Sequence, residues 1–167
     1  MLASVNHVGP RISIPDQLCE RGVGPGLIDS VLFRYEQSEA RKLYHMLIPI
    51  ISHAHWDHSR PISNEFPNAT AYFGPGTKDN CSPGHWADPS QQWDGHYFDP
   101  ENGTENWKEL DGPWIPFGPF DKALDFFGDG TFWVIQAPGH MPGNLCAAAR
   151  IKGQKWVLLG SDCCHSR

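Results

Sequence analysis

Four side chains that can bind a metal ion lie within six consecutive residues, His53-Ala54-His55-Trp56-Asp57-His58. The apolar residues 47–51 precede them and are typical of a buried strand. In extended backbone, side chains two residues apart point to the same side, so His53 and His55 can bind one ion. A turn after Trp56 would bring Asp57 and His58 to a second position beside it. The motif predicts a metal site at a strand end; the alternative is a solvated histidine-rich loop.

Two later strand ends each offer one more ligand. Residues 131–135 are apolar and lead into Ala137-Pro138-Gly139-His140, in which proline and glycine favour the turn that aims the histidine. The apolar residues 158–159 lead through Gly160 and Ser161 to Asp162, a carboxylate that can bridge two ions. One such residue after a strand is common. Three strand ends that deliver ligands in the order HxHxDH, His and Asp favour a metal site over a solvated loop.

This order of ligands resembles the metallo-β-lactamase superfamily, whose signature is H-x-H-x-D-H followed downstream by a His and then an Asp. The resemblance covers residues 52–162, and the stretch 52–58 is most similar to the lactonase-like hydrolases, which include fungal members. It implies that His53, His55 and His140 bind a first metal ion. It further implies that Asp57 and His58 bind a second ion and that Asp162 bridges the two.

The resemblance also implies an activity. A metal-dependent hydrolase would attack an ester, lactone or lactam carbonyl of a small-molecule substrate through a metal-bound hydroxide. The expected cofactor is Zn²⁺, as one or two ions, with other divalent metals left open. Asp57 and His165 are the expected catalytic residues. His165 stands three residues after Asp162, at the position where a residue of lactonase-like relatives helps to hold the carbonyl oxygen of the substrate. The alternative for His165 is an exposed histidine near the end of the chain.

The fold implied by the resemblance is α+β, an αββα sandwich of two mostly antiparallel sheets flanked by helices. Relatives complete their second metal site with a histidine well downstream of the bridging Asp, and this sequence ends at Arg167. We therefore expect a partial sandwich that is truncated at the C-terminus. The alternative function is a truncated, catalytically inactive metal-binding or interaction module.

Short apolar segments predict the regular elements. Residues 123–127, 131–136, 145–151 and 155–159 predict successive strands with tight turns at 128–130 and 152–154, which is typical of an antiparallel sheet. Residues 69–73 predict another strand, and residues 59–66 a short helix.

The length predicts a single domain over residues 1–167, with two unusual segments. Residues 34–51 are interpreted as an insertion, either a family-specific helical segment or retained non-coding sequence. Residues 77–118 hold four of the seven tryptophans without a sustained period and predict a long loop. We interpret this loop as a lid over the metal site, with Trp93 and Trp107 near the substrate and His85 and His96 at its rim. The alternative is an aromatic-rich packing insert.

Composition bears on partners and compartment. The chain has 13 Lys and Arg against 19 Asp and Glu, a net charge of −6, which disfavours a nucleic-acid partner. No stretch reaches the roughly 18 apolar residues of a membrane span, and residues 1–10 lack the pattern of a signal peptide. The expectation is a cytoplasmic protein without a membrane partner. Five cysteines without a C-x-x-C pair disfavour a disulfide framework, and the oligomeric state stays open.

Overall fold

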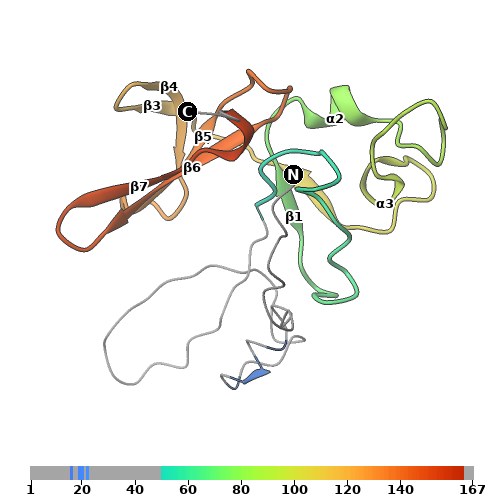
Figure 1. Ribbon diagram of the computed structural model, residues 1–167, viewed down its shortest axis with the longest axis horizontal. Helices are drawn as coiled ribbons and strands as arrows, with labels where there is room; N and C mark the ends of the chain where they lie inside the picture. Colours follow the sequence, from blue (N-terminus) through green and yellow to red (C-terminus); the bar gives the residue numbers. More distant parts are fainter. Residues whose placement is uncertain (1–15, 17–18, 21, 23–49, 164–167) are drawn as a thin grey trace, which may run out of the picture.

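The structure is a computed structural model that describes residues 16, 19, 20, 22 and 50–163. The catalytic candidate His165 lies outside the described residues, as do residues 34–49 of the expected insertion. The described part contains a two-stranded sheet and a five-stranded sheet with a few short helices. This composition of elements confirms the expected α+β class. Figure 1 shows the five-stranded sheet on the left and the elements of the first half of the described chain on the right.

The five-stranded sheet is an antiparallel meander. Its strands follow one another in the sheet in chain order: β3 (Ile115–Phe117), β4 (Phe120–Asp125), β5 (Phe132–Gln136), β6 (Leu145–Ile151) and β7 (Lys155–Leu159). The four strands expected in this part of the chain are confirmed: β6 and β7 have the expected bounds, β5 begins one residue later, and β4 begins and ends earlier. Strand β3 is an additional one. The turn from β6 to β7 contains Gly153 at φ 80° and Gln154 at φ 60°, the left-handed backbone that a tight hairpin requires.

The two-stranded sheet pairs with the segment that leads into the metal motif. Strand β1 (Ala71–Phe73) pairs in parallel with β2 (Trp107–Glu109), and Ile50 forms a further parallel bridge with Tyr72 of β1. The Ile51 N–H donates to the Tyr72 carbonyl at 2.8 Å. The apolar segment before the histidines therefore ends in an extended backbone beside β1, as expected, and β1 confirms the strand expected at 69–73.

The short helix expected over residues 59–66 is wrong. This stretch forms a single turn, in which the Phe66 N–H donates to the Ile62 carbonyl at 2.7 Å. The Glu105 carboxylate accepts the N–H groups of Ile62 and Ser63, both at 3.0 Å. In a helix over residues 59–66, these N–H groups would donate to the carbonyl oxygens of residues 58 and 59. The distant carboxylate binds them instead, and the chain turns away after residue 66.

The segment of residues 77–118 contains regular elements that the sequence pattern did not reveal. They are α2 (Thr77–Cys81), α3 (Gly95–Phe98), β2 and β3. The rings of Tyr97, Phe98 and Trp107 surround Phe73 of β1, with centroids 5.2–5.5 Å away in edge-to-face contacts. Phe73, Tyr97 and Phe98 are at most 2% exposed, so much of this segment is core. Burial of large aromatic side chains is a major stabilising contribution.

A separate apolar cluster joins the two sheets. Leu110, Val134 of β5 and Leu145 of β6 are buried, and Ile50 and Tyr72 pack against them. This cluster holds the segment that precedes the histidines beside strands β5 and β6 of the meander. This contact positions the candidate site.

The last strand of the meander is exposed along its length. β7 is an edge strand, and Trp156, Leu158 and Leu159 are 43%, 56% and 54% exposed. Among the described residues, no helix has the length and apolar character to cross a membrane.

Candidate metal centre

The histidine motif lies between β1 and the start of β6. The Ser52 carbonyl accepts the Leu145 N–H at 2.7 Å, which ties the start of the motif to the meander. The N–H groups of His58 and Ser59 both donate to the His55 carbonyl, at 3.0 and 2.9 Å, so the backbone turns after His55. This turn returns the His58 ring to Ser52, whose Oγ lies 3.1 Å from His58 Nδ1.

His140 reaches the motif from the loop between β5 and β6. The Ala137 N–H donates to the Asn144 carbonyl at 2.9 Å and closes this loop at its base. Gly143, at φ 79°, lies so close to Thr77 of α2 that a side chain there would collide with it. With the loop docked in this way, His140 Nε2 lies 2.9 Å from His55 Nδ1.

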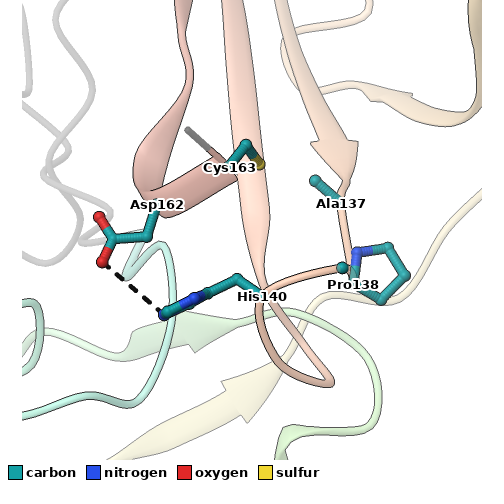
Figure 2. A pocket seen from close by; sticks show the side chains of 6 residues that line it. Ala137, Pro138, His140, Asp162 and Cys163 are labelled. Atoms are coloured by element: carbon teal, nitrogen blue, oxygen red, sulfur yellow. Dashed lines mark ion pairs between the residues drawn. The ribbon is translucent and has the colours of Figure 1, made fainter. Parts of the chain in front are cut away.

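Asp162 comes from the third strand end. It lies on the short 3-10 helix η2 (Ser161–Cys163), directly after β7. Its Oδ1 is 3.3 Å from His58 Nε2, while its Oδ2 is 3.8 Å from His53 Nε2 and 3.7 Å from His140 Nε2. Figure 2 shows the Asp162 carboxylate turned toward the His140 ring. The two carboxylate oxygens therefore face two different groups of imidazoles.

Two groups of donor atoms result, and they share one histidine. The first contains His53, His55 and His140, the second His53, His58 and Asp162, and within each group the donor atoms lie within 4.8 Å of one another. Ligands around one tetrahedral zinc ion lie about 3.3 Å apart, given Zn–N bonds of about 2.0–2.1 Å. The side-chain adjustment needed to bind an ion is therefore small.

His53 is the buried centre of this arrangement. Its side chain is fully buried, and its Nε2 has no hydrogen-bond partner in the part of the chain that the structure describes. The pKa of His53 is lowered to about 4, chiefly by burial and then by the nearby His58, His55 and His140, while Asp162 opposes them. An imidazole that is neutral, buried and without a partner at Nε2 is the state that a metal ion requires of a ligand. The residues present therefore fit a divalent ion.

Two residues of the motif point elsewhere. The Asp57 side chain is 53% exposed, and its Oδ2 lies 3.8 Å from His58 Nε2, but it belongs to neither donor group of the described residues. Trp56 is 84% exposed. Of the six residues expected as ligands, the structure brings together His53, His55, His58, His140 and Asp162, with Asp57 at the rim.

The segment expected as a lid contacts the site through Trp93. Trp93 is 9% exposed and stacks on the His55 ring, with centroids 5.7 Å apart and ring planes 17° from parallel. Trp107 packs in the core instead. His85 Nδ1 lies 2.8 Å from the Trp93 carbonyl oxygen, and His96 pairs with Asp94 at 2.7 Å. Neither histidine belongs to the donor groups found in the described ranges.

A cavity opens beside the candidate metal centre. It has a volume of about 430 Å³ and is lined by Ala137, Pro138, Gly139, His140, Asp162 and Cys163 (Figure 2). This size falls within the range of small-molecule sites.

Sequence reasoning missed the polar residues behind His53. Ser52 Oγ and Ser161 Oγ each lie 3.3 Å from His53 Nδ1, and Ser161 in turn donates to the Asn144 side chain at 3.1 Å. The two serines stand directly before His53 and Asp162 in the sequence, which is a usable signal. Asn144 offers none, because its contact with these residues is tertiary.

Comparisons with known proteins indicate which proteins this chain is similar to. No family model matches the chain. A metallo-hydrolase, mfmC, of Annulohypoxylon moriforme is 38% identical over 120 residues, which are 70% of this chain and 30% of that protein. The gamma-lactamase MBL2 of Gibberella moniliformis is 34% identical over 122 residues, 70% of this chain and 48% of that protein. The N-acyl homoserine lactonase AttM of Rhizobium radiobacter is 30% identical over 122 residues, 69% of this chain and 40% of that protein.

These similarities identify the class of protein. The chain belongs to the metallo-β-lactamase superfamily. Its sheets and short helices are those of a partial metallo-β-lactamase-like fold. The matches span less than half the length of each of these three relatives.

Proposed function

We propose that this chain forms the metal-binding part of a metal-dependent hydrolase that acts on an ester, lactone or lactam carbonyl of a small molecule. The observation that carries the proposal is the pair of donor groups that share His53, which is fully buried and has no hydrogen-bond partner at Nε2 among the described residues. A buried imidazole without a partner costs stability unless it has a ligand to bind. Relatives named as a metallo-hydrolase, a lactamase and a lactonase support the reaction class.

We propose Zn²⁺ as the ion, because imidazole and carboxylate donors in a tetrahedral arrangement suit it. When bound, the metal supplies a Lewis acid for the carbonyl oxygen and an acidified water. His53, His55 and His140 would hold the first ion, and His58 with Asp162 would hold the second. The Asp162 carboxylate, which faces both groups, would orient the histidines on either side of it.

Two residues retain their proposed catalytic roles. Asp57 would join the second group by rotation of its half-exposed side chain, whose Oδ2 lies 3.8 Å from His58 Nε2. His165, three residues after Asp162, is proposed to contact the carbonyl oxygen of the substrate. The cavity beside His140 and Asp162 is the proposed substrate site.

Zinc binding by the full chain tests the first part of this proposal. Equilibrium dialysis with metal analysis is expected to find at least one zinc ion in the wild-type protein and a loss of most of it in His55→Ala. His96→Ala is the matched control, because this histidine lies outside both donor groups in the described structure and pairs with Asp94 instead. Equal zinc loss in the two variants would contradict the assignment of the site.

Hydrolysis tests the second part. The zinc-loaded chain is expected to open a chromogenic lactone or lactam, with activity lost on addition of a chelator and in His55→Ala. Retention of activity in the presence of the chelator would exclude a metal-dependent reaction.

A second candidate function has an observation in its favour. The exposed apolar edge strand β7 fits an inactive metal-binding or interaction module, since exposed strand edges pair readily with other chains. Bound zinc without turnover of esters, lactones and lactams would support this candidate over the hydrolase.

A further inference from the structure

We propose that Asn144 is the positioning residue of the metal centre: through Ser161 it holds the proton of His53 on Nδ1 and so leaves Nε2 open to a metal ion. Asn144 is 1% exposed and lies directly before β6, outside the ligand motif. The inference rests on the proposed metal site and adds to it a residue that selects the tautomer of its central ligand.

The first step is the orientation of the Asn144 amide. Its Nδ2 donates to the Ala137 carbonyl oxygen at 2.8 Å. A carbonyl oxygen can only accept, so the end of the amide that faces Ala137 must be the NH₂ group. The oxygen of the amide, Oδ1, is then directed to the opposite side, where Ser161 lies.

The second step determines which group donates in the contact between Ser161 and His53. The Ser161 hydroxyl donates to Asn144 Oδ1 at 3.1 Å, which uses its only proton. Ser161 Oγ can then act only as an acceptor toward His53 Nδ1, 3.3 Å away. The contact is a hydrogen bond only if His53 carries its proton on Nδ1, and the lone pair of the buried Nε2 then remains without a partner inside the described structure. A histidine that binds a metal ion through Nε2 needs this tautomer.

Ser52 does not provide the same control. Its Oγ lies 3.3 Å from His53 Nδ1 but also 3.1 Å from His58 Nδ1. The Ser52 hydroxyl can donate to either of these two ring nitrogens. No carbonyl acceptor determines which of them it chooses. The chain from Ala137 through Asn144 and Ser161 is the one with a determined direction.

Asn144 also joins the other two ligand-bearing segments. Its backbone carbonyl accepts the Ala137 N–H at 2.9 Å and its N–H donates to the Met141 carbonyl at 3.2 Å, so it closes the loop that carries His140. Its Nδ2 also lies 3.4 Å from Cys163 Sγ, next to Asp162. Ala137 and Cys163 both appear in the cavity wall in Figure 2.

The backbone of Ser161 supports a role beyond packing. Its φ of 49° lies in the left-handed region, which costs free energy for a residue with a side chain. Glycine would adopt this conformation without that cost, yet it would lack the hydroxyl that links Asn144 to His53. Ser161→Gly is therefore expected to remove the link between Asn144 and His53 without lowering the stability of the fold.

The test uses the full chain labelled with ¹⁵N-histidine. In the metal-free protein, long-range proton–nitrogen correlation spectra at pH 8 report the tautomer of each ring, and His53 is assigned from the signal lost in His53→Ala. The expected wild-type result is His53 with its proton on Nδ1. In Ser161→Gly and Asn144→Ala, His53 is expected to populate both tautomers, because the Ser52 hydroxyl can then donate to Nδ1.

Zinc affinity, from competition with a chromophoric chelator, gives the second readout. Loss of a group that orients a ligand weakens metal binding by about 10- to 100-fold. We expect a weakening of this size in Ser161→Gly without a loss of thermal stability. Gln154→Gly is the matched control: it also places glycine where a residue with a side chain has a positive φ, at the exposed β6–β7 turn, and should leave both the tautomer and zinc affinity unchanged.

Two results would overturn the proposal. One is a wild-type His53 with its proton on Nε2, which can be observed whether or not the protein binds zinc. The other is a Ser161→Gly protein with the wild-type tautomer and a zinc affinity within twofold of the wild type. A wild-type chain that binds no zinc would contradict the proposed function, while the tautomer measurement would still decide the role of Asn144.

Discussion

His53 shows at the scale of one residue how this site is built. A fully buried imidazole nitrogen without a partner costs about 1–3 kcal/mol relative to a satisfied one. The low pKa of His53 keeps the ring neutral, so the side chain does not add the larger cost of a buried charge. A ligand that binds Nε2 in the folded state recovers part of this free energy. Metal binding and stability are coupled through this one atom.

Trp93 carries a prediction at the same scale. Replacement by alanine removes a ring that stacks on His55, and aromatic contacts of this kind contribute about 0.5–1.5 kcal/mol. Trp93→Ala is expected to weaken zinc binding by about two- to tenfold, measured by chelator competition. Trp107→Ala is the control, because its ring packs on Phe73 and Phe98 away from the histidines. Equal zinc affinity in Trp93→Ala and Trp107→Ala would show that the stack does not position His55.

At the scale of elements, the site depends on segments that are too short to be stable alone. Strands β1 and β2 have three residues each, and α3 has four. Isolated elements of this length are marginal in water, so tertiary contacts decide their form. The Glu105 carboxylate is one such contact. It joins the segment after the histidine motif to the residues that precede β2.

Glu105 gives a prediction about this contact. The carboxylate is 8% exposed and accepts from Ile62 N, Ser63 N and Ser63 Oγ. Glu105→Ala leaves these donors without their acceptor and is expected to lower the free energy of unfolding by about 2–4 kcal/mol. Glu105→Gln keeps one acceptor oxygen and should lose about half as much. Urea unfolding followed by fluorescence measures both, and equal losses in the two variants would refute this role of the carboxylate.

At the scale of the whole molecule, the two sheets differ in how completely they are covered. Val134 in the middle of β5 and Leu145 at the start of β6 belong to a buried apolar cluster against which Tyr72 of β1 packs, whereas β7 is exposed along its length. An uncovered apolar edge strand promotes association with other chains.

Leu158 tests this consequence. Leu158→Lys places a charge on the exposed edge strand and is expected to reduce self-association, seen as a smaller mass in light scattering after size exclusion. Gln154→Lys adds the same charge in the adjacent turn and controls for net charge alone. If both variants reduce association equally, the edge strand is not its cause.

The histidine motif and the meander were accessible from the sequence because their signals are local. Metal-ligand spacing within six residues and alternating apolar strands need no knowledge of distant contacts. The short helix expected at 59–66 failed because Glu105, about 40 residues away, binds the same backbone donors. The elements of residues 77–118 were not recognised because each is shorter than the window over which periodicity can be seen.

The sequence by itself determined which groups can bind a metal ion and the order in which three strand ends deliver them. Only the tertiary structure decided that His140 Nε2 lies 2.9 Å from His55 Nδ1, that Asp57 remains at the rim, and that Asn144 stands behind His53. The physical reason is range. Ligand chemistry and strand pattern are properties of neighbouring residues, whereas the direction of a hydrogen-bond chain and the exposure of a side chain depend on packing between segments that are distant in sequence.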